Sequence, residues 1–295
     1  MHRLTGLALA LLPVAAAAHH VDGEGVGLGG PSWLEALLAV LLLASAIGYA
    51  RGVANLWRRA GIGRGIAVRD AVRFALGWST LAIALFSPLD TLADRSFAVH
   101  MVQHELLMIV AAPWLAASRT YEAWSWALRR GGVRTLATLA RAWRWLAAPR
   151  RAWCLHAAAL WLWHVPAFFL AALGDETLHA LQHASFFFSA LLFWWAVFGS
   201  RRRERQGTAL ALLLTTMLQM NALGLLLTFA PDPWYAPDEP PPWGLTALED
   251  QQLGALVMWM IGGMVYAGAA LAVVARWISP AAVAARAGEL RGGGS

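Results

Sequence analysis

A series of seven long apolar segments is the feature that most constrains what this chain can fold into. The segments run from Trp33 to Tyr49, Ala71 to Phe86, Phe97 to Ala117, Trp153 to Leu173, Thr177 to Phe198, Thr208 to Ala230 and Gln252 to Trp277. Apolar runs of about 18 residues or more are typical of membrane-spanning helices. Because lipid offers no partners for backbone polar groups, such segments must be helical. The sequence therefore predicts an all-α, polytopic membrane protein with seven transmembrane helices.

The composition agrees with a membrane protein of one domain. Hydrophobic residues make up 59% of the 295 residues and charged residues only 14%, whereas soluble domains average about 25% charged. No polar segment is long enough to bury a core of its own. We therefore assign residues 33–278 to a single seven-helix membrane domain.

The two ends of the chain differ from this domain in character. Residues 1–18 combine a charged start, a short apolar stretch and an Ala-rich end, which resembles a secretory signal peptide. Residues 19–32 would then form an external amino-terminal segment. Residues 279–295 are expected to be a cytoplasmic tail.

Arginine placement predicts the orientation of the helices. All 23 basic residues are Arg, and they gather in alternate loops. Those loops follow the first, third, fifth and seventh segments, and their arginines include Arg51, Arg58, Arg59, Arg119, Arg150, Arg151, Arg201, Arg202, Arg203 and Arg276. The other loops are acidic and nearly free of Arg. The positive-inside rule then puts the amino terminus outside and the carboxyl terminus in the cytoplasm.

The third loop is long and rich in both Arg and Trp. Its stretch ARAWRWLAAPRRAW suits a helix lying at the inner membrane face. A solvated basic loop that simply obeys the topology rule fits the same sequence. The net charge of +6 is explained by this topology, and we expect no nucleic-acid partner.

Two copies of one polar pentapeptide lie inside the apolar segments. HMVQH contributes His100 and His104, and HALQH contributes His179 and His183. Residues four apart share a helix face, so each pair can point at one object near the outer boundary. His164, beside a helix-disturbing proline, reaches a similar depth from the fourth segment.

Histidine in lipid is costly, which makes these pairs candidates for function. Neutral imidazole is a common ligand of copper, zinc and iron, and two pairs on adjacent helices could supply four nitrogens. The glutamines at the centre of each motif could orient the rings. The alternative is that the histidines only form hydrogen bonds between helices.

Other side chains could join a metal site at this depth. Met101 and Met220 are the preferred thioether candidates, since sulfur favours Cu(I), although methionine is also an ordinary core residue. Glu105 could be a ligand, a proton carrier or an ion-pair partner. Asp250 opens the seventh segment, where it could help a cation enter or could simply complement the helix dipole.

A weak repeat relates the two histidine-bearing segments. Pro88 precedes His100, and Pro166 precedes His179, by nearly the same number of residues. The second and third segments would then resemble the fourth and fifth as a pair of similarly oriented hairpins.

Four stretches together resemble the CtaG family, whose members assist the assembly of caa-type cytochrome c oxidase. They are SPLDTLADRSFAVHMVQHELLMIVAAPWL, HVPAFFLAAL, LHALQHASFF and WGLTALEDQQLGALVMW. The resemblance implies a seven-span protein of the bacterial inner (plasma) membrane that helps build an active haem–copper oxidase. It also implies that copper handling is the leading molecular role.

We therefore expect an assembly factor, not an enzyme, that acts as a copper chaperone. An external copper donor and caa-type oxidase subunits would be its partners, with the lipid bilayer around it. A haem-binding membrane cytochrome and a metal transporter are the rival functions. A scaffold that binds no metal is a third possibility.

Overall fold

The computed structural model describes residues 32–128, 130–199, 206–235 and 240–278. Helices dominate these residues, and none of them belongs to a β-strand. The predicted signal peptide, nearly all of the external amino-terminal segment and the predicted cytoplasmic tail lie outside this described part of the chain.

Five helices in the described ranges are long and apolar enough to cross a membrane. They are α1 (Trp33–Ala60), the run α4–η2–α5 (Phe97–Ala116), α10 (Glu176–Gly199), α11 (Gln206–Thr228) and the run α12–η5–α13 (Ala247–Ile278). A sixth span arises if α8 (Pro149–Trp163) and α9 (Pro166–Gly174) are taken together across their 78° bend. The chain is therefore an all-helical, multi-pass membrane protein.

The helix α2 (Val68–Phe86) contains the second predicted span, Ala71 to Phe86. It is not among the five, or six, candidates found by length and composition. Its first two turns carry Arg69, Asp70 and Arg73, and Arg73 pairs with Asp70 at 2.8 Å. These charges shorten the apolar part of the helix, so a count of seven spans stays a prediction.

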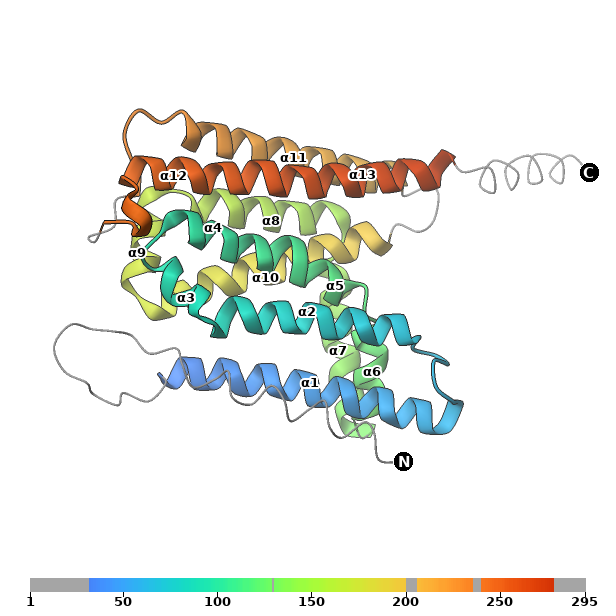
Figure 1. Cartoon of the computed structure of the whole chain (residues 1–295). Coiled ribbons are helices and arrows are strands. Elements are labelled where there is room, and N and C mark those ends of the chain that lie inside the picture. Colours follow the sequence, from blue (N-terminus) through green and yellow to red (C-terminus); the bar gives the residue numbers. More distant parts are fainter. Residues whose placement is uncertain (1–31, 129, 200–205, 236–239, 279–295) are drawn as a thin grey trace, which may run out of the picture.

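The long helices run side by side in alternating directions (Figure 1). One end of the bundle holds the carboxyl ends of α1 and α13 and the start of α2, and the last turns of α1 and α13 carry Arg58, Arg59 and Arg276. The other end holds α3 (Pro88–Ala93), α9 and the start of α12. The helices thus sort the basic ends from the acidic loops, as the charge pattern predicts, while the membrane orientation itself stays a prediction.

The Arg- and Trp-rich loop is helical. It forms α6 (Thr120–Ala127) and α7 (Arg130–Leu146), and α6 packs along α1. On α7, Leu139 and Trp145 are exposed beside the arginines. This favours the predicted surface helix over an irregular loop.

Each histidine-bearing helix is preceded by a short helix that begins at a proline. Pro88 starts α3 before α4, and Pro166 starts α9 before α10. Proline suits the first turn of a helix because its missing N–H has no partner there anyway. The two prolines thus mark the sharp turns that direct α4 and α10 into the bundle.

The start of α4 (Phe97–Glu105) is fixed by a carboxylate from another helix. Asp250, in the first turn of α12, accepts hydrogen bonds from Ser96 Oγ at 2.7 Å, Phe97 N at 2.6 Å and Ala98 N at 3.3 Å. Gly254 permits this approach, because a Cβ there would lie 2.5 Å from the Phe97 ring. Asp250 therefore accepts hydrogen bonds from the free N–H groups at the amino end of the helix that carries His100 and His104. Its carboxylate also complements the dipole of that helix.

Asp250→Ala should destabilise the protein by about 2 kcal/mol, because buried donors at the start of α4 lose a charged acceptor. Glu249→Ala is the matched control, since Glu249 caps only its own helix through Thr246 and is more exposed. Thermal unfolding of both purified variants in one detergent measures the difference. Equal midpoints for Asp250→Ala and wild type would contradict the capping role.

Candidate metal centre

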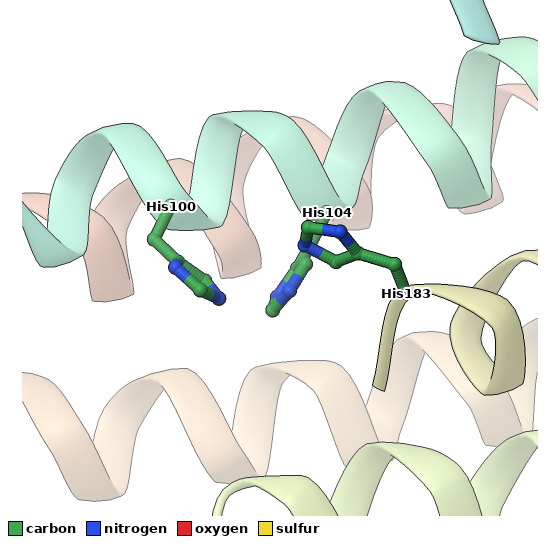
Figure 2. A group of neighbouring side chains, drawn as sticks. All are labelled: His100, His104 and His183. Atoms are coloured by element: carbon green, nitrogen blue, oxygen red, sulfur yellow. The ribbon is translucent and has the colours of Figure 1, made fainter. Parts of the chain in front are cut away.

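Three histidines converge between α4 and α10. His100 and His104 project from α4, one turn apart, and His183 reaches them from α10 (Figure 2). One ring nitrogen from each lies within 4.8 Å of the others, and all three side chains are buried. These distances suit a single ion that is bound by nitrogen from two helices.

His179 completes a group of four rings. Its ring lies 4.3 Å from that of His183 and 5.3 Å from that of His100, centroid to centroid. It is half-buried, whereas His100 is fully buried. Asp94, at the end of α3, lies within electrostatic range of His179. His179 thus stands at the edge of the cluster nearest to the loops.

His164 lies near the cluster but points one nitrogen elsewhere. Its Nδ1 is 2.6 Å from the Leu160 carbonyl oxygen, which leaves Nε2 as the free atom. It is close enough to His100 and His104 to interact with them electrostatically. The break between α8 and α9 falls here, so His164 can approach the cluster from a helix end.

Most of the ring nitrogens in this region have no hydrogen-bond partner among the described residues. Buried nitrogens outside direct hydrogen-bond geometry are His100 Nδ1 and Nε2, His104 Nδ1 and Nε2, His164 Nε2, His179 Nε2 and His183 Nε2. The Gln182 side chain and the Ala93 backbone come near the His100 ring without reaching that geometry. Buried polar atoms are nearly always paired, because an unpaired one costs about 1–3 kcal/mol. The residues present therefore fit a bound cation, which would use these nitrogens as ligands.

Aromatic rings close the cluster on several sides. Phe169 lies 5.1 Å from the His100 ring and Phe186 lies 4.5 Å from the His104 ring. Tyr235, from the loop after α11, packs on Phe169 and donates a 2.6 Å hydrogen bond to the His164 carbonyl. Burial raises the pKa of the Tyr235 phenol, which keeps this donor protonated.

An apolar cavity adjoins the cluster from the side. Its volume is about 630 Å³, and it lies between α1, α2, α7 and α10. Leu42, Trp78, Leu139 and Ala184 are on its wall, and His183 is there too. The cluster is therefore approached both from the loops and from the interior of the bundle.

Met101 is not part of this cluster. Its side chain is 1% exposed and belongs to the main hydrophobic core together with Phe97 and Met108. Residue 101 follows His100 directly, so it points about 100° away from the histidine face.

Glu105 and Met220 are brought together, but at a different place. Both Glu105 oxygens and the Met220 methyl group surround Gly262, between α11 and η5 (Val257–Gly262). Asp250 is likewise separate, because its carboxylate caps α4. The candidate ligands thus divide into a histidine cluster, a Glu105–Met220 pair and a helix cap.

The two motif glutamines have unlike surroundings. Gln103 Nε2 donates to the Ala84 carbonyl at 2.8 Å and to Asp90 at 2.5 Å, so it ties α4 to α2 and α3. Gln182 is fully buried and lies beside His100. Only Gln182 is placed where it could orient a ring of the cluster.

A family model described as cytochrome c oxidase caa3 assembly factor (Caa3_CtaG) matches residues 47–279. No curated protein and no solved structure matches the chain. The matched range extends from within α1 to the end of α13 and includes every histidine of the cluster. This confirms the resemblance seen in the sequence: the chain belongs to the caa3 cytochrome c oxidase assembly factor family.

Proposed function

We propose that this assembly factor binds copper at the histidine cluster and delivers it to a subunit of the caa-type oxidase. Membership of the family makes the oxidase the assembly target. The observation that carries the copper proposal is the convergence of His100, His104 and His183, with their unpaired nitrogens, inside a membrane domain. Imidazole nitrogen is a favourable ligand for copper in either oxidation state.

Ring spacing favours a single ion over a haem. The centroids of neighbouring rings in the cluster are 4.3–5.9 Å apart. A porphyrin between two axial imidazoles would need a wider gap than this, because the macrocycle and both iron–nitrogen bonds must fit between the rings. The rival function of a membrane cytochrome is therefore less well supported than copper binding.

Delivery requires that the ion can leave again. His179 is half-buried, and the cluster lies near the end of the bundle that the charge pattern assigns to the outside. An external donor would load the ion from this side of the bacterial inner membrane. The protein then acts as a carrier and not as an enzyme, since no covalent bond is made or broken apart from coordination.

The apolar cavity supports a lateral route of delivery. It reaches His183 from within the bundle and is walled by apolar side chains of α1, α2, α7 and α10. A hydrophobic segment of the receiving oxidase subunit could approach the cluster there without exposing polar groups to lipid. Loading from the loops and release toward the cavity would use different sides of the same site.

Removing one histidine pair should strongly weaken copper binding at the cluster. We expect His100→Ala/His104→Ala to weaken that site roughly 100-fold or more, given what single supporting groups contribute at metal sites. Titration of the purified protein with Cu(I) against a colorimetric chelator measures this. His156→Gln is the matched control, because His156 is equally buried but is bonded to Ser189 and Tyr266. Unchanged binding in the double alanine variant would refute the site.

The same double variant should fail to support oxidase assembly when copper is scarce. In a strain that lacks the native protein, cells carrying His100→Ala/His104→Ala should make oxidase deficient in copper and in activity. Oxidase activity and copper per oxidase in isolated membranes measure the effect, with His156→Gln cells as control. Fully active oxidase in copper-poor medium would contradict copper delivery.

A variant whose cavity is filled should still bind copper at the histidine cluster but should deliver less of it to the oxidase. Ala184→Trp places a large ring on the cavity wall one residue from His183, so it should block approach while leaving the ligands in place. We expect near-normal copper binding and a several-fold loss of assembled oxidase. Leu218→Trp on the exposed face of α11 is the control. Normal assembly by Ala184→Trp would argue against a lateral route.

A further inference from the structure

Glu105 is a buried carboxylate in the middle of a membrane helix bundle. It is 4% exposed, and neither of its oxygens has a hydrogen-bond partner among the described residues. It follows His104 in sequence, yet it faces α11 and η5, whereas His104 faces α10. Intramembrane carboxyl groups are expensive and are kept where they bind or move something.

Three side-chain atoms surround one small space beside Gly262. The position that a Cβ of residue 262 would take lies 3.2 and 3.3 Å from the two Glu105 oxygens and 3.2 Å from the Met220 methyl carbon. Glycine at 262 leaves this space to the two side chains. The Met220 methyl group, and not its sulfur, faces this point. The thioether sulfur lies one bond behind the methyl carbon, so a change of the Met220 side-chain rotamer would be needed to turn the sulfur toward the Glu105 oxygens.

The backbone on both sides of this space departs from regular α-helix. The π-helical segment η2 (Leu106–Ala111) begins directly after Glu105, and the π-helical segment η5 ends at Gly262. Segments of this kind occur often at functional sites, because they re-aim side chains within a helix. Two of them meeting at one unpaired carboxylate is a second, independent sign of a binding site.

Further polar groups lie near this space. Tyr266, one turn after Gly262, lies within electrostatic range of Glu105. Its hydroxyl is 3.2 Å from His156 Nε2, and His156 Nδ1 is 3.2 Å from Ser189 Oγ. Tyr266, His156 and Ser189 are all buried and bonded to one another, so they form a separate polar group, none of whose atoms is among the three nearest to the space beside Gly262.

The charge and the donor types define the ligand. One carboxylate neutralises one positive charge, and a neutral ion pair is far less costly in a low-dielectric interior than an isolated charge. A divalent ion is disfavoured, because among the described residues Glu105 belongs to no group of three or more His, Cys, Asp or Glu side chains that could share an ion. Thioether sulfur disfavours hard ions such as Na⁺ and favours Cu(I).

We propose that Glu105 and Met220 form a second metal site, which holds one soft monovalent cation of the Cu(I) type. This inference rests on the proposed function, in which such an ion is the cargo. The two sites share α4 but open to opposite neighbours: the histidines to α10, and Glu105 to α11 and η5. The protein then carries two ions at once, one bound by nitrogen and one by carboxylate and sulfur.

Calorimetric titration with Ag(I), a redox-inert analogue of Cu(I), tests the proposal on the purified full-length protein in detergent. Wild type should bind two equivalents. His100→Ala/His104→Ala/His183→Ala should keep one, and Glu105→Gln should keep the other. Met220→Leu, which conserves volume, should weaken the site that survives in the histidine variant at least about tenfold. Met264→Leu is the matched control, because Met264 is 64% exposed.

Two results would overturn the second site. One is full wild-type stoichiometry and affinity in both Glu105→Gln and Met220→Leu. The other is that wild type binds one equivalent of Ag(I) and the triple histidine variant binds none. That variant must at the same time remain monodisperse and helical. In the second case the histidine site, and with it the proposed function, stands. A single equivalent in wild type that is kept in the histidine variant and lost in Glu105→Gln would instead refute the histidine site and leave the second site standing.

Discussion

The cost of a polar group without a partner in the membrane interior governs this structure. Most buried polar side chains meet that cost with neighbours: Asp250 with the start of α4, Gln251 with the loop at Trp234 and with Leu227, and His156 with Ser189 and Tyr266. The histidine cluster and Glu105 do not, and neither do a few other buried groups such as Gln182 and Thr216. Since an unpaired group is unfavourable in lipid, the clustering of such groups at the histidines is what supports the proposed ion site.

Helix α4 carries several of these buried polar side chains, and its successive residues face different neighbouring helices. His100 and His104 point at α10 (Figure 2). Gln103 contacts α2 and α3, and Glu105 faces α11 and η5. The amino end of α4 is held by Asp250, and its carboxyl end passes into a π-helical segment. A helix in contact with neighbours on all sides in this way holds its two histidines in fixed positions.

Sequence patterns predicted much of the helical framework. Apolar length located α1, α4–α5, α10, α11 and α12–α13, and the four-residue spacing of the histidines put each pair on one face. Two features were beyond such patterns. Charges in the first turns of α2 leave its status as a span open. Pro166 indicates a break in the fourth segment, but the 78° angle between α8 and α9 is known only from the structure.

By itself, the sequence determined that this chain is a helical membrane protein of the caa3 oxidase assembly factor family with two histidine pairs, because apolar length and residue spacing are local properties of the chain. Only the tertiary structure decided which of the candidate residues lie together. It joined His183 to His100 and His104, and it separated Glu105, Met220 and Asp250 from them. The reason is that each of these contacts depends on the rotation of one helix against another, which no single segment encodes.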